Sequence, residues 1–163
     1  MGEHFINQLK SNPERLHIGE EVYLNGVASV LKKLQGYNGN NYMLWPDDLD
    51  TMLEQMPDKS LDVIHVLFPD PWHKRKYLKK RLFNLERLAL FKQKLKNRGF
   101  ISFASDIDDY FDSIKSILEN DEEFKITGED FLIPHTGYVQ TKYHTKAIRE
   151  GRVAQLISST YKS

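Results

Sequence analysis

The sequence predicts an α/β fold built around a mostly parallel, doubly wound sheet. Two observations carry this prediction: strand-length segments rich in apolar and β-branched residues alternate with amphipathic segments of helix length, and the run 61–68 is almost continuously apolar. Such a run is typical of a parallel strand covered on both faces. The 163 residues contain no repeat, low-complexity tract or linker, so we expect a single domain over residues 1–163.

The first half of the chain is expected to contain three helices and three strands. We place the helices at residues 4–12, 22–35 and 49–56, and the strands at 16–19, 42–45 and 61–68. The second of these helices carries an apolar stripe formed by Val22, Val27, Val30, Leu31 and Leu34. Gly36 and Gly39 follow a helix instead of a strand, so we interpret them as part of a turn and not as a nucleotide-binding loop.

The second half continues the alternation. Asn84 is expected to cap a helix that ends at Gly99, where a left-handed conformation is cheap, and whose inner face holds Leu85, Leu88, Phe91 and Leu95. A further helix at 106–120 should bury Tyr110, Phe111, Ile114, Ile117 and Leu118. Strands are expected at 100–104, 124–127 and 153–158, with a short polar helix at 141–150.

Composition excludes several classes of function. The chain has no cysteine, which rules out disulfides, thiolate zinc sites and cysteine nucleophiles and fits a reducing compartment, so we expect a cytoplasmic protein. No apolar run reaches the roughly 18 residues that a membrane span needs. The six histidines lack metal-ligand spacing, so no metal is expected, and no G-x-S-x-G elbow indicates serine-based hydrolysis.

The net charge of zero hides a strong segregation of charge. The segment 74–81 holds six cations and no acid, whereas residues 106–130 are strongly acidic. Local patches steer partners more than the total charge does. The basic block suits a phosphate backbone, although a solvated surface is the commoner use of such a run.

Asp70 lies between two prolines directly after the apolar run. Each proline ring fixes φ and removes a hydrogen-bond donor, so this carboxylate cannot sit inside a helix and is expected at a rigid chain corner. In open α/β sheets, ligands bind beyond the carboxyl ends of the strands. Asp70 and Trp72 are therefore expected to face a ligand, the alternative being that Asp70 caps the next helix.

Two separated motifs carry a family resemblance. The first is Phe68-Pro69-Asp70-Pro71-Trp72-His73-Lys74 followed by the basic block, and the second is Thr141-Lys142-Tyr143. With Ile18-Gly19-Glu20-Glu21 and Leu44-Trp45-Pro46-Asp47-Asp48, the chain resembles bacterial tRNA (guanine-N7-)-methyltransferases over essentially its whole length. The resemblance implies a Rossmann-like class I methyltransferase fold, S-adenosylmethionine as methyl donor, and tRNA as substrate, modified at guanine 46 of the variable loop.

Compared with that family, the chain is expected to lack the first strand and the glycine-rich donor loop, because Met1 leads directly into a helix. The absent strand is central in the family's sheet, so its neighbours would lose hydrogen-bond partners. A wrongly placed start codon, a piece of a split or fused enzyme, and a decayed gene leaving a catalytically inactive tRNA-binding remnant are the alternatives.

The resemblance also implies roles for individual residues. Asp70 corresponds to the active-site acid that also contacts the donor, and Glu21 and Asp48 correspond to donor-binding acids, with Glu20 and Asp47 as alternatives one position away. The substrate positions are Lys74, Asp106, Thr141, Lys142, Tyr143 and His144. His144 departs from the family, which usually has glutamate there. Arg75, Lys76, Lys79, Lys80 and Arg81 would grip RNA phosphates, and Trp72 or Tyr143 could stack on an extruded base.

Overall fold

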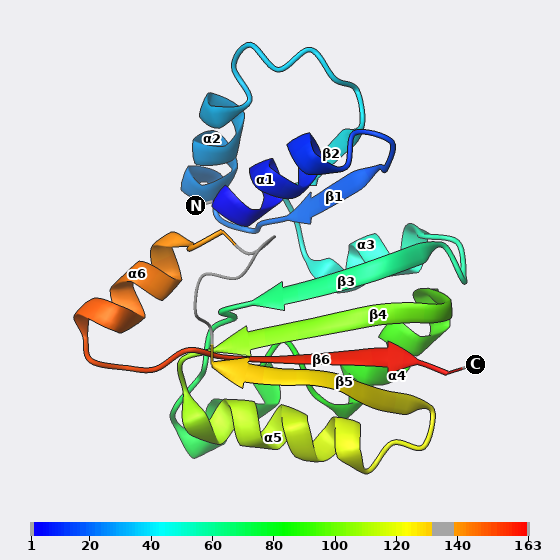
Figure 1. The fold of residues 1–163 in the computed structure, drawn as a ribbon, viewed down its shortest axis with the longest axis vertical. Helices are drawn as coiled ribbons and strands as arrows, with labels where there is room; N and C mark the ends of the chain where they lie inside the picture. Colours follow the sequence, from blue (N-terminus) through cyan, green and yellow to red (C-terminus); the bar gives the residue numbers. More distant parts are fainter. Residues whose placement is uncertain (1, 132–138, 163) are drawn as a thin grey trace. The chain divides into compact units, whose positions relative to one another are not determined.

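The computed structural model describes residues 2–131 and 139–162, and its contacts divide the chain into two compact units (Figure 1). The first unit holds the described residues up to Gln55 together with 139–145, and the second holds residues 56–131 and 146–162. Each unit has its own sheet and its own core, and each is described separately below.

The first unit is built on a parallel pair of short strands, β1 (His17–Glu20) and β2 (Tyr42–Trp45). Helices α1 (Glu3–Ser11), α2 (Leu24–Lys33) and α3 (Leu49–Gln55) complete it. Leu9, Val30 and Leu34 form its buried core, against which partly buried aromatic and aliphatic side chains pack. The expected elements are confirmed here within two residues. The apolar stripe of α2 is narrower than expected, because Val22 precedes the helix and Leu31 within it is 50 % exposed.

The second unit contains a four-stranded sheet in the order β3-β4-β6-β5. Its strands are β3 (Leu61–Leu67), β4 (Leu95–Ser105), β5 (Phe124–Phe131) and β6 (Gln155–Tyr161), and its helices include η1 (Arg75–Lys80), α4 (Leu85–Lys94) and α5 (Asp108–Glu119). β3 and β4 are parallel, whereas β6 pairs antiparallel with both β4 and β5. Helix α6 (Lys142–Arg149) leads the chain from the first unit back to the second. The α/β prediction is confirmed, with a mixed sheet.

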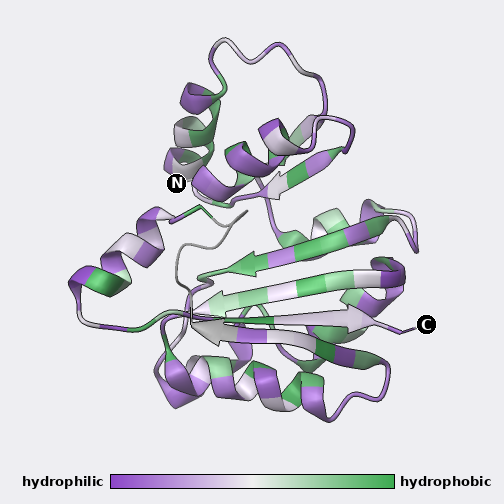
Figure 2. Ribbon diagram, in the orientation of Figure 1, coloured by the Kyte–Doolittle hydropathy of each residue, from purple (hydrophilic) through white to green (hydrophobic). Residues whose placement is uncertain are grey.

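Phenylalanine side chains between the sheet and α4 and α5 form the core of the second unit. Phe83 packs edge-to-face on both Phe91 and Phe103, with centroid distances of 5.5 and 5.6 Å, and Phe103 lies 5.0 Å from the Tyr110 ring. Phe111, Ile114 and Leu118 extend the same buried face of α5, as its spacing predicts. Figure 2 shows hydrophobic residues running along β3 and β4.

Two sequence expectations about helix α4 are wrong. The helix does not end at Gly99: α4 ends at Lys94, and β4 begins at once with Leu95. Arg98, with φ 61°, takes the left-handed conformation, and a side chain at Gly99 would meet the Lys96 carbonyl at 2.8 Å, so the glycine serves close packing. Leu85 is 67 % exposed at the start of α4, although Asn84 does cap that helix by accepting a hydrogen bond from the Arg87 amide.

Strand β3 is less covered than its apolar sequence predicts. Val66 is buried, whereas most of the other residues of the strand are half-buried. Among the described residues, β3 pairs only with β4 and β1 pairs only with β2. Each of these two parallel strands therefore has one edge without a strand partner in the described part of the chain. No helix in the described ranges is long and apolar enough to cross a membrane.

Candidate active site

The loop after β3 holds Asp70 in an unusual backbone setting. The Phe68 amide makes a last sheet-like hydrogen bond to the Ala104 carbonyl at 2.8 Å, and the chain then leaves the sheet. Phe68 (φ 52°) and Trp72 (φ 44°) both adopt left-handed conformations, on either side of Pro69-Asp70-Pro71. Such conformations cost roughly 1–3 kcal/mol for residues other than glycine and cluster at functional sites. The chain corner expected from the sequence is therefore present, with a left-handed residue on each side of it.

The Asp70 carboxylate is exposed, and the structure gives it no hydrogen bond or ion pair with another described residue. It does not cap a helix: the residue that precedes η1 is Lys74, and its side chain makes no capping bond. The fold thus holds the backbone of Asp70 at a strained corner while its side chain stays uncommitted. This arrangement excludes the capping alternative. Asp70 lines neither of the two pockets described below, so its ligand-facing role stays a prediction.

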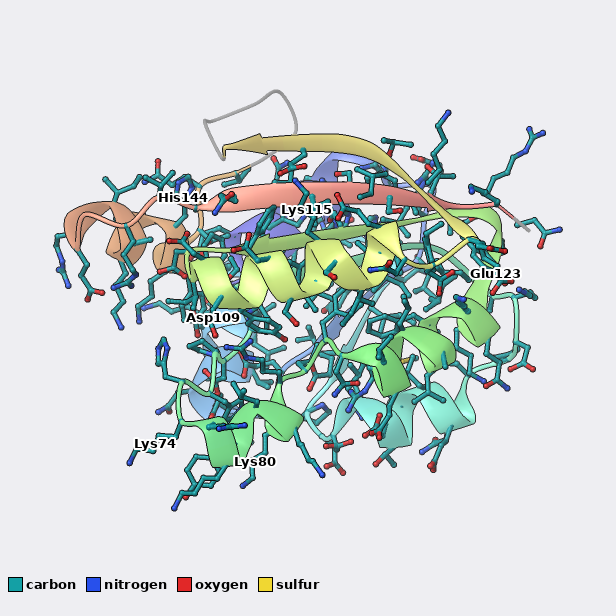
Figure 3. The ribbon with its side chains drawn as sticks, turned by 90° about the horizontal axis from the view of Figure 1, so that it is seen from below. Lys74, Lys80, Asp109, Lys115, Glu123 and His144 are labelled. Atoms are coloured by element: carbon teal, nitrogen blue, oxygen red, sulfur yellow. The ribbon has the colours of Figure 1, made fainter. Side chains whose placement is uncertain are left out.

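The basic block follows as η1, and most of its cations point into solvent. Lys74, Arg75, Lys76, Lys79 and Lys80 are exposed. Figure 3 shows Lys74 and Lys80 projecting away from the body of the unit. Lys80 Nζ lies 5.2 Å from the ring centroids of both Trp72 and Tyr77, which pack edge-to-face at 5.8 Å. The segment after β3 therefore carries the exposed Trp72 ring, the half-buried Tyr77 ring and the Lys80 ammonium group side by side.

Arg81 does not fit the expected phosphate-gripping role. Its side chain is 8 % exposed, its Nε donates to the Pro71 carbonyl at 2.9 Å, and its Nη2 contacts the Asp109 carboxylate at 2.5 Å. The guanidinium carbon also lies 4.5 Å from the centroid of the Tyr110 ring. The charge of Arg81 is thus already satisfied inside the protein, and the exposed basic surface consists of the other five cations.

Asp106 follows the neighbouring strand β4, whose Ala104 is in register with Leu67 of β3. Asp70 and Asp106 therefore come from the carboxyl ends of adjacent parallel strands, the edge where ligands bind in α/β sheets. The Asp106 carboxylate accepts a hydrogen bond from Arg152 Nε at 2.6 Å, and Arg152 also pairs with Glu150. A cavity of about 510 Å³ opens here, lined by Asp106, Ile107, Asp108, Asp109, Gly151, Arg152 and Val153.

In the first unit, the acids expected to bind the donor follow β1 and β2, which are also adjacent and parallel. A pocket of about 130 Å³ at this place is lined by Gly2, Phe5, Gly19, Glu20, Glu21, Val27, Val30, Leu44 and Trp45. Glu21 Oε1 accepts a hydrogen bond from the Tyr23 amide at 2.9 Å, and a side chain at Gly26 would collide with the Glu21 carboxylate. Both alternatives, Glu20 and Glu21, therefore remain at the pocket.

Asp48 has a clear structural role at the start of α3. Its Oδ1 accepts from the Asp50 amide at 2.7 Å, and its carbonyl accepts from Trp45 Nε1 at 3.2 Å. Asp47 in turn accepts from the Asp48 amide at 2.7 Å. Neither Asp47 nor Asp48 lines the 130 Å³ pocket, so the geometry shows a helix-start acid, and a donor contact by Asp48 stays a prediction.

The second motif divides into buried and exposed members. Thr141 is 7 % exposed, and its hydroxyl accepts from the His144 amide at 3.2 Å, which caps α6. His144 is 3 % exposed, whereas Lys142 and Tyr143 face solvent, Tyr143 being 42 % exposed. Lys142 and Tyr143 are therefore the members that an RNA could reach, and His144 is packed in the interior.

Sequence reasoning did not single out Arg152, and it grouped Arg81 with the exposed cations although its side chain is buried. Arg152 stands in a charged loop without periodicity, and its pairing with Asp106 joins residues 46 positions apart. Within the described residues, the structure shows no group of three or more side chains that could hold a metal ion.

Comparison with known proteins identifies the kind of protein. A family model described as "Putative methyltransferase" matches residues 1–156. The chain belongs to this methyltransferase family. It is 52 % identical over 158 residues to a protein of Rickettsia felis named "Bifunctional methyltransferase", covering 96 % of this chain and 30 % of the relative. It is also 36 % identical to the "tRNA (guanine-N(7)-)-methyltransferase" of Wolbachia pipientis, covering 93 % of this chain and 66 % of that protein.

Solved structures show the same fold for this methyltransferase chain. An antibiotic-related methyltransferase superposes with a TM-score of 0.65 at 18 % identity, covering 98 % of this chain and 81 % of that one. An rRNA methylase from Streptococcus thermophilus gives 0.60 at 9 % identity, covering 92 % and 75 %. The methyltransferase chain spans about 30 % of the length of its Rickettsia relative.

Proposed function

We propose that this methyltransferase transfers a methyl group from S-adenosylmethionine to guanine N7 of tRNA, at position 46 of the variable loop. The observation that carries the proposal is the uncommitted Asp70 carboxylate at its strained corner, beside the exposed Trp72 ring and exposed cations. Relatives named tRNA (guanine-N(7)-)-methyltransferase support the choice of base and substrate, with 36 and 37 % identity over 151 and 154 residues.

The chemistry asks little more of the protein than placement and charge. Guanine N7 has a free lone pair, so no proton has to be removed before it attacks the sulfonium methyl carbon, and the C–S electron pair leaves with the thioether. Alignment of the two reactants is then the main contribution of the protein. The base gains positive charge in the transition state, which a fixed carboxylate such as Asp70 stabilises.

The proposed donor contacts come from the first unit. Glu20 and Glu21 line the pocket at the carboxyl end of a parallel strand. In such folds, an acid at this place accepts hydrogen bonds from the ribose hydroxyls of a nucleoside cofactor. Trp45 in the same lining offers an apolar face, and Asp48 follows β2 on the adjacent strand. A solved neighbour from Streptococcus mutans, with a TM-score of 0.54, is in complex with SAH, which supports a sulfonium nucleoside as the donor.

Binding of the donor separates catalysis from mere RNA binding. We expect isothermal titration of the purified protein with S-adenosylmethionine to show saturable binding, and Glu21→Gln to weaken it about tenfold, because one charged hydrogen bond is lost. Glu14→Gln, an exposed glutamate of the same unit, is the matched control and should bind like the parent. Donor binding that Glu21→Gln leaves intact would remove Glu21 from the site.

The tRNA contacts are proposed for η1 and for the exposed members of α6. Lys74, Arg75, Lys76, Lys79 and Lys80 contact phosphates in this proposal, and Lys142 and Tyr143 reach the same substrate. Trp72, 37 % exposed, offers a ring for stacking on an unpaired base. Asp106, already held by Arg152, presents its carboxylate to the 510 Å³ cavity.

Salt dependence tests the phosphate contacts. The double variant Lys79→Ala, Lys80→Ala should lower tRNA affinity and reduce the slope of log K against log salt by about 1 to 2. The reason is that a protein with fewer phosphate contacts releases fewer counterions from the RNA when it binds. Lys125→Ala, an exposed lysine on β5, should leave the slope unchanged. Equal slopes for the parent and the double variant in fluorescence-anisotropy titrations would contradict the assignment of η1.

A second candidate is that the chain acts as part of a longer, fused methyltransferase. Two observations favour it: the chain spans 30 % of the relative named bifunctional methyltransferase, and β1 and β3 each have an edge without a strand partner among the described residues. A catalytically inactive tRNA-binding remnant is the further alternative. If the purified chain binds tRNA but shows no heat of donor binding, these two candidates replace the first.

A further inference from the structure

We propose that Arg81 is a positioning residue that fixes the Asp70 loop against helix α5. This inference rests on the proposed function, because it concerns how the Asp70 carboxylate is held for catalysis. Among the described residues, two basic side chains are buried, those of Arg81 and Lys94. Of these two, Arg81 contacts the Asp70 loop, whereas Lys94 donates to the Met56 carbonyl.

The loop has few other polar anchors. Pro69 and Pro71 have no amide hydrogen, and no backbone hydrogen bond involves residues 69–73 in the described part of the chain. The last sheet-like hydrogen bond is the one donated by the Phe68 amide. The next backbone hydrogen bond along the chain is donated by the Tyr77 amide to the Lys74 carbonyl, in η1. The bond from Arg81 Nε to the Pro71 carbonyl therefore supplies the polar restraint next to Asp70.

Arg81 is itself held from two further sides. The carboxylate of Asp109 accepts from its Nη2 at 2.5 Å, and its guanidinium lies over the Tyr110 ring. Tyr110 is fully buried, and its hydroxyl accepts from the Phe83 amide at 2.8 Å, so the ring cannot move independently of the core. Both residues belong to the first turn of α5, which begins directly after the loop that carries Asp106. Arg81 thus ties the loop after β3 to the first turn of α5.

This geometry calls for arginine and not merely for a cation. A planar guanidinium can donate from Nε and Nη2 in two fixed directions while its face lies on an aromatic ring, whereas a lysine ammonium is a point charge on a flexible stem. Burying a charge is costly unless it is paired, so the position is poorly suited to gripping a mobile phosphate. The exposed neighbours Arg75 and Lys80 are suited to that task.

The test uses Arg81→Lys in the purified protein, with both tryptophans replaced by 5-fluorotryptophan. We expect the ¹⁹F signal of Trp72 to shift or broaden, because the loop loses its restraint, while the signal of Trp45 in the other unit stays unchanged. Arg98→Lys, an exposed arginine on β4, is the matched control and should alter neither signal. In methyl-transfer assays, Arg81→Lys should lower kcat by about 10- to 100-fold with the KM for tRNA unchanged, as expected for a misplaced group.

The outcomes separate the possible roles of Arg81. An unchanged Trp72 signal in Arg81→Lys overturns the proposal, and so does a raised KM for tRNA with kcat intact, which would make Arg81 a phosphate contact. Should Arg81→Lys fail to fold, the variant Asp109→Asn serves instead, because it keeps Arg81 but removes the carboxylate that pairs with it. Asp109→Asn must then shift or broaden the Trp72 signal, or the proposal fails. If the parent protein transfers no methyl group, the proposed function fails, while the ¹⁹F spectra still decide the role of Arg81.

Discussion

Asp70→Ala should lower kcat for methyl transfer to tRNA by about 100- to 1000-fold, which corresponds to a loss of about 3–4 kcal/mol of transition-state stabilisation. The carboxylate is exposed and makes no bond with other described residues, so removing it should not destabilise the fold. Positive charge develops on the guanine during transfer, and the variant lacks the fixed negative charge that opposes it. Single-turnover methylation with labelled donor measures the effect separately from product release.

The control for this experiment is Asp112→Asn, an exposed carboxylate on α5 that has no part in the proposed site. It should match the parent in both kcat and thermal stability. Full activity of Asp70→Ala, in a protein that methylates tRNA, would refute the assignment of Asp70. A fall in activity accompanied by an equal loss of folded protein would instead make Asp70 a structural residue.

The second large effect concerns stability at high pH. Burial raises the pKa of the Tyr110 hydroxyl from 10.0 to about 12. In the unfolded chain this phenol ionises near pH 10, so its contribution to stability is fully present below pH 10 and is lost as the pH rises to about 12. The loss amounts to roughly 2–3 kcal/mol, since one pKa unit corresponds to about 1.4 kcal/mol. The free energy of unfolding in urea should therefore fall steeply over this range.

Tyr110→Phe isolates this contribution from that of the other titrating groups. The variant should be less stable than the parent at pH 8, because the buried Phe83 amide loses its acceptor, and the difference should shrink as the pH approaches 12. Tyr143→Phe, which removes the hydroxyl of an exposed tyrosine, should follow the parent at every pH. Parallel curves for the parent and Tyr110→Phe would contradict the assigned pKa.

Local sequence signals predicted most of the fold. The strand at Tyr42–Trp45 was placed to the residue, and Asn84 caps α4 as its side-chain chemistry predicts. The signals failed where tertiary packing overrides local preference. Gly99 suggested a helix end, but the helix stops five residues earlier, because Leu95 enters β4 and pairs with Leu61 of β3. The sequence of residues 95–99 alone does not predict that pairing.

The candidate site was predictable where a motif fixes the backbone and unpredictable where side chains meet across the fold. Two prolines around Asp70 made a corner the only outcome, and the structure has it. In contrast, Arg81 looks like one more cation of the basic block, and only its contacts with Pro71 and Asp109 show that it is a buried restraint. Charge patterning finds a basic surface but cannot tell which of its members points inward.

The most direct test maps the methyl group on its product. The purified protein is incubated with S-adenosylmethionine and unmodified tRNA transcript, and nucleoside mass spectrometry after specific cleavage locates the modification. We predict a single N7-methylguanine in the variable loop, whose initial rate of formation falls by about 100- to 1000-fold when Asp70→Ala replaces the parent. A methyl group on another base or another atom, or an equal initial rate of N7-methylguanine formation by Asp70→Ala, would contradict the account.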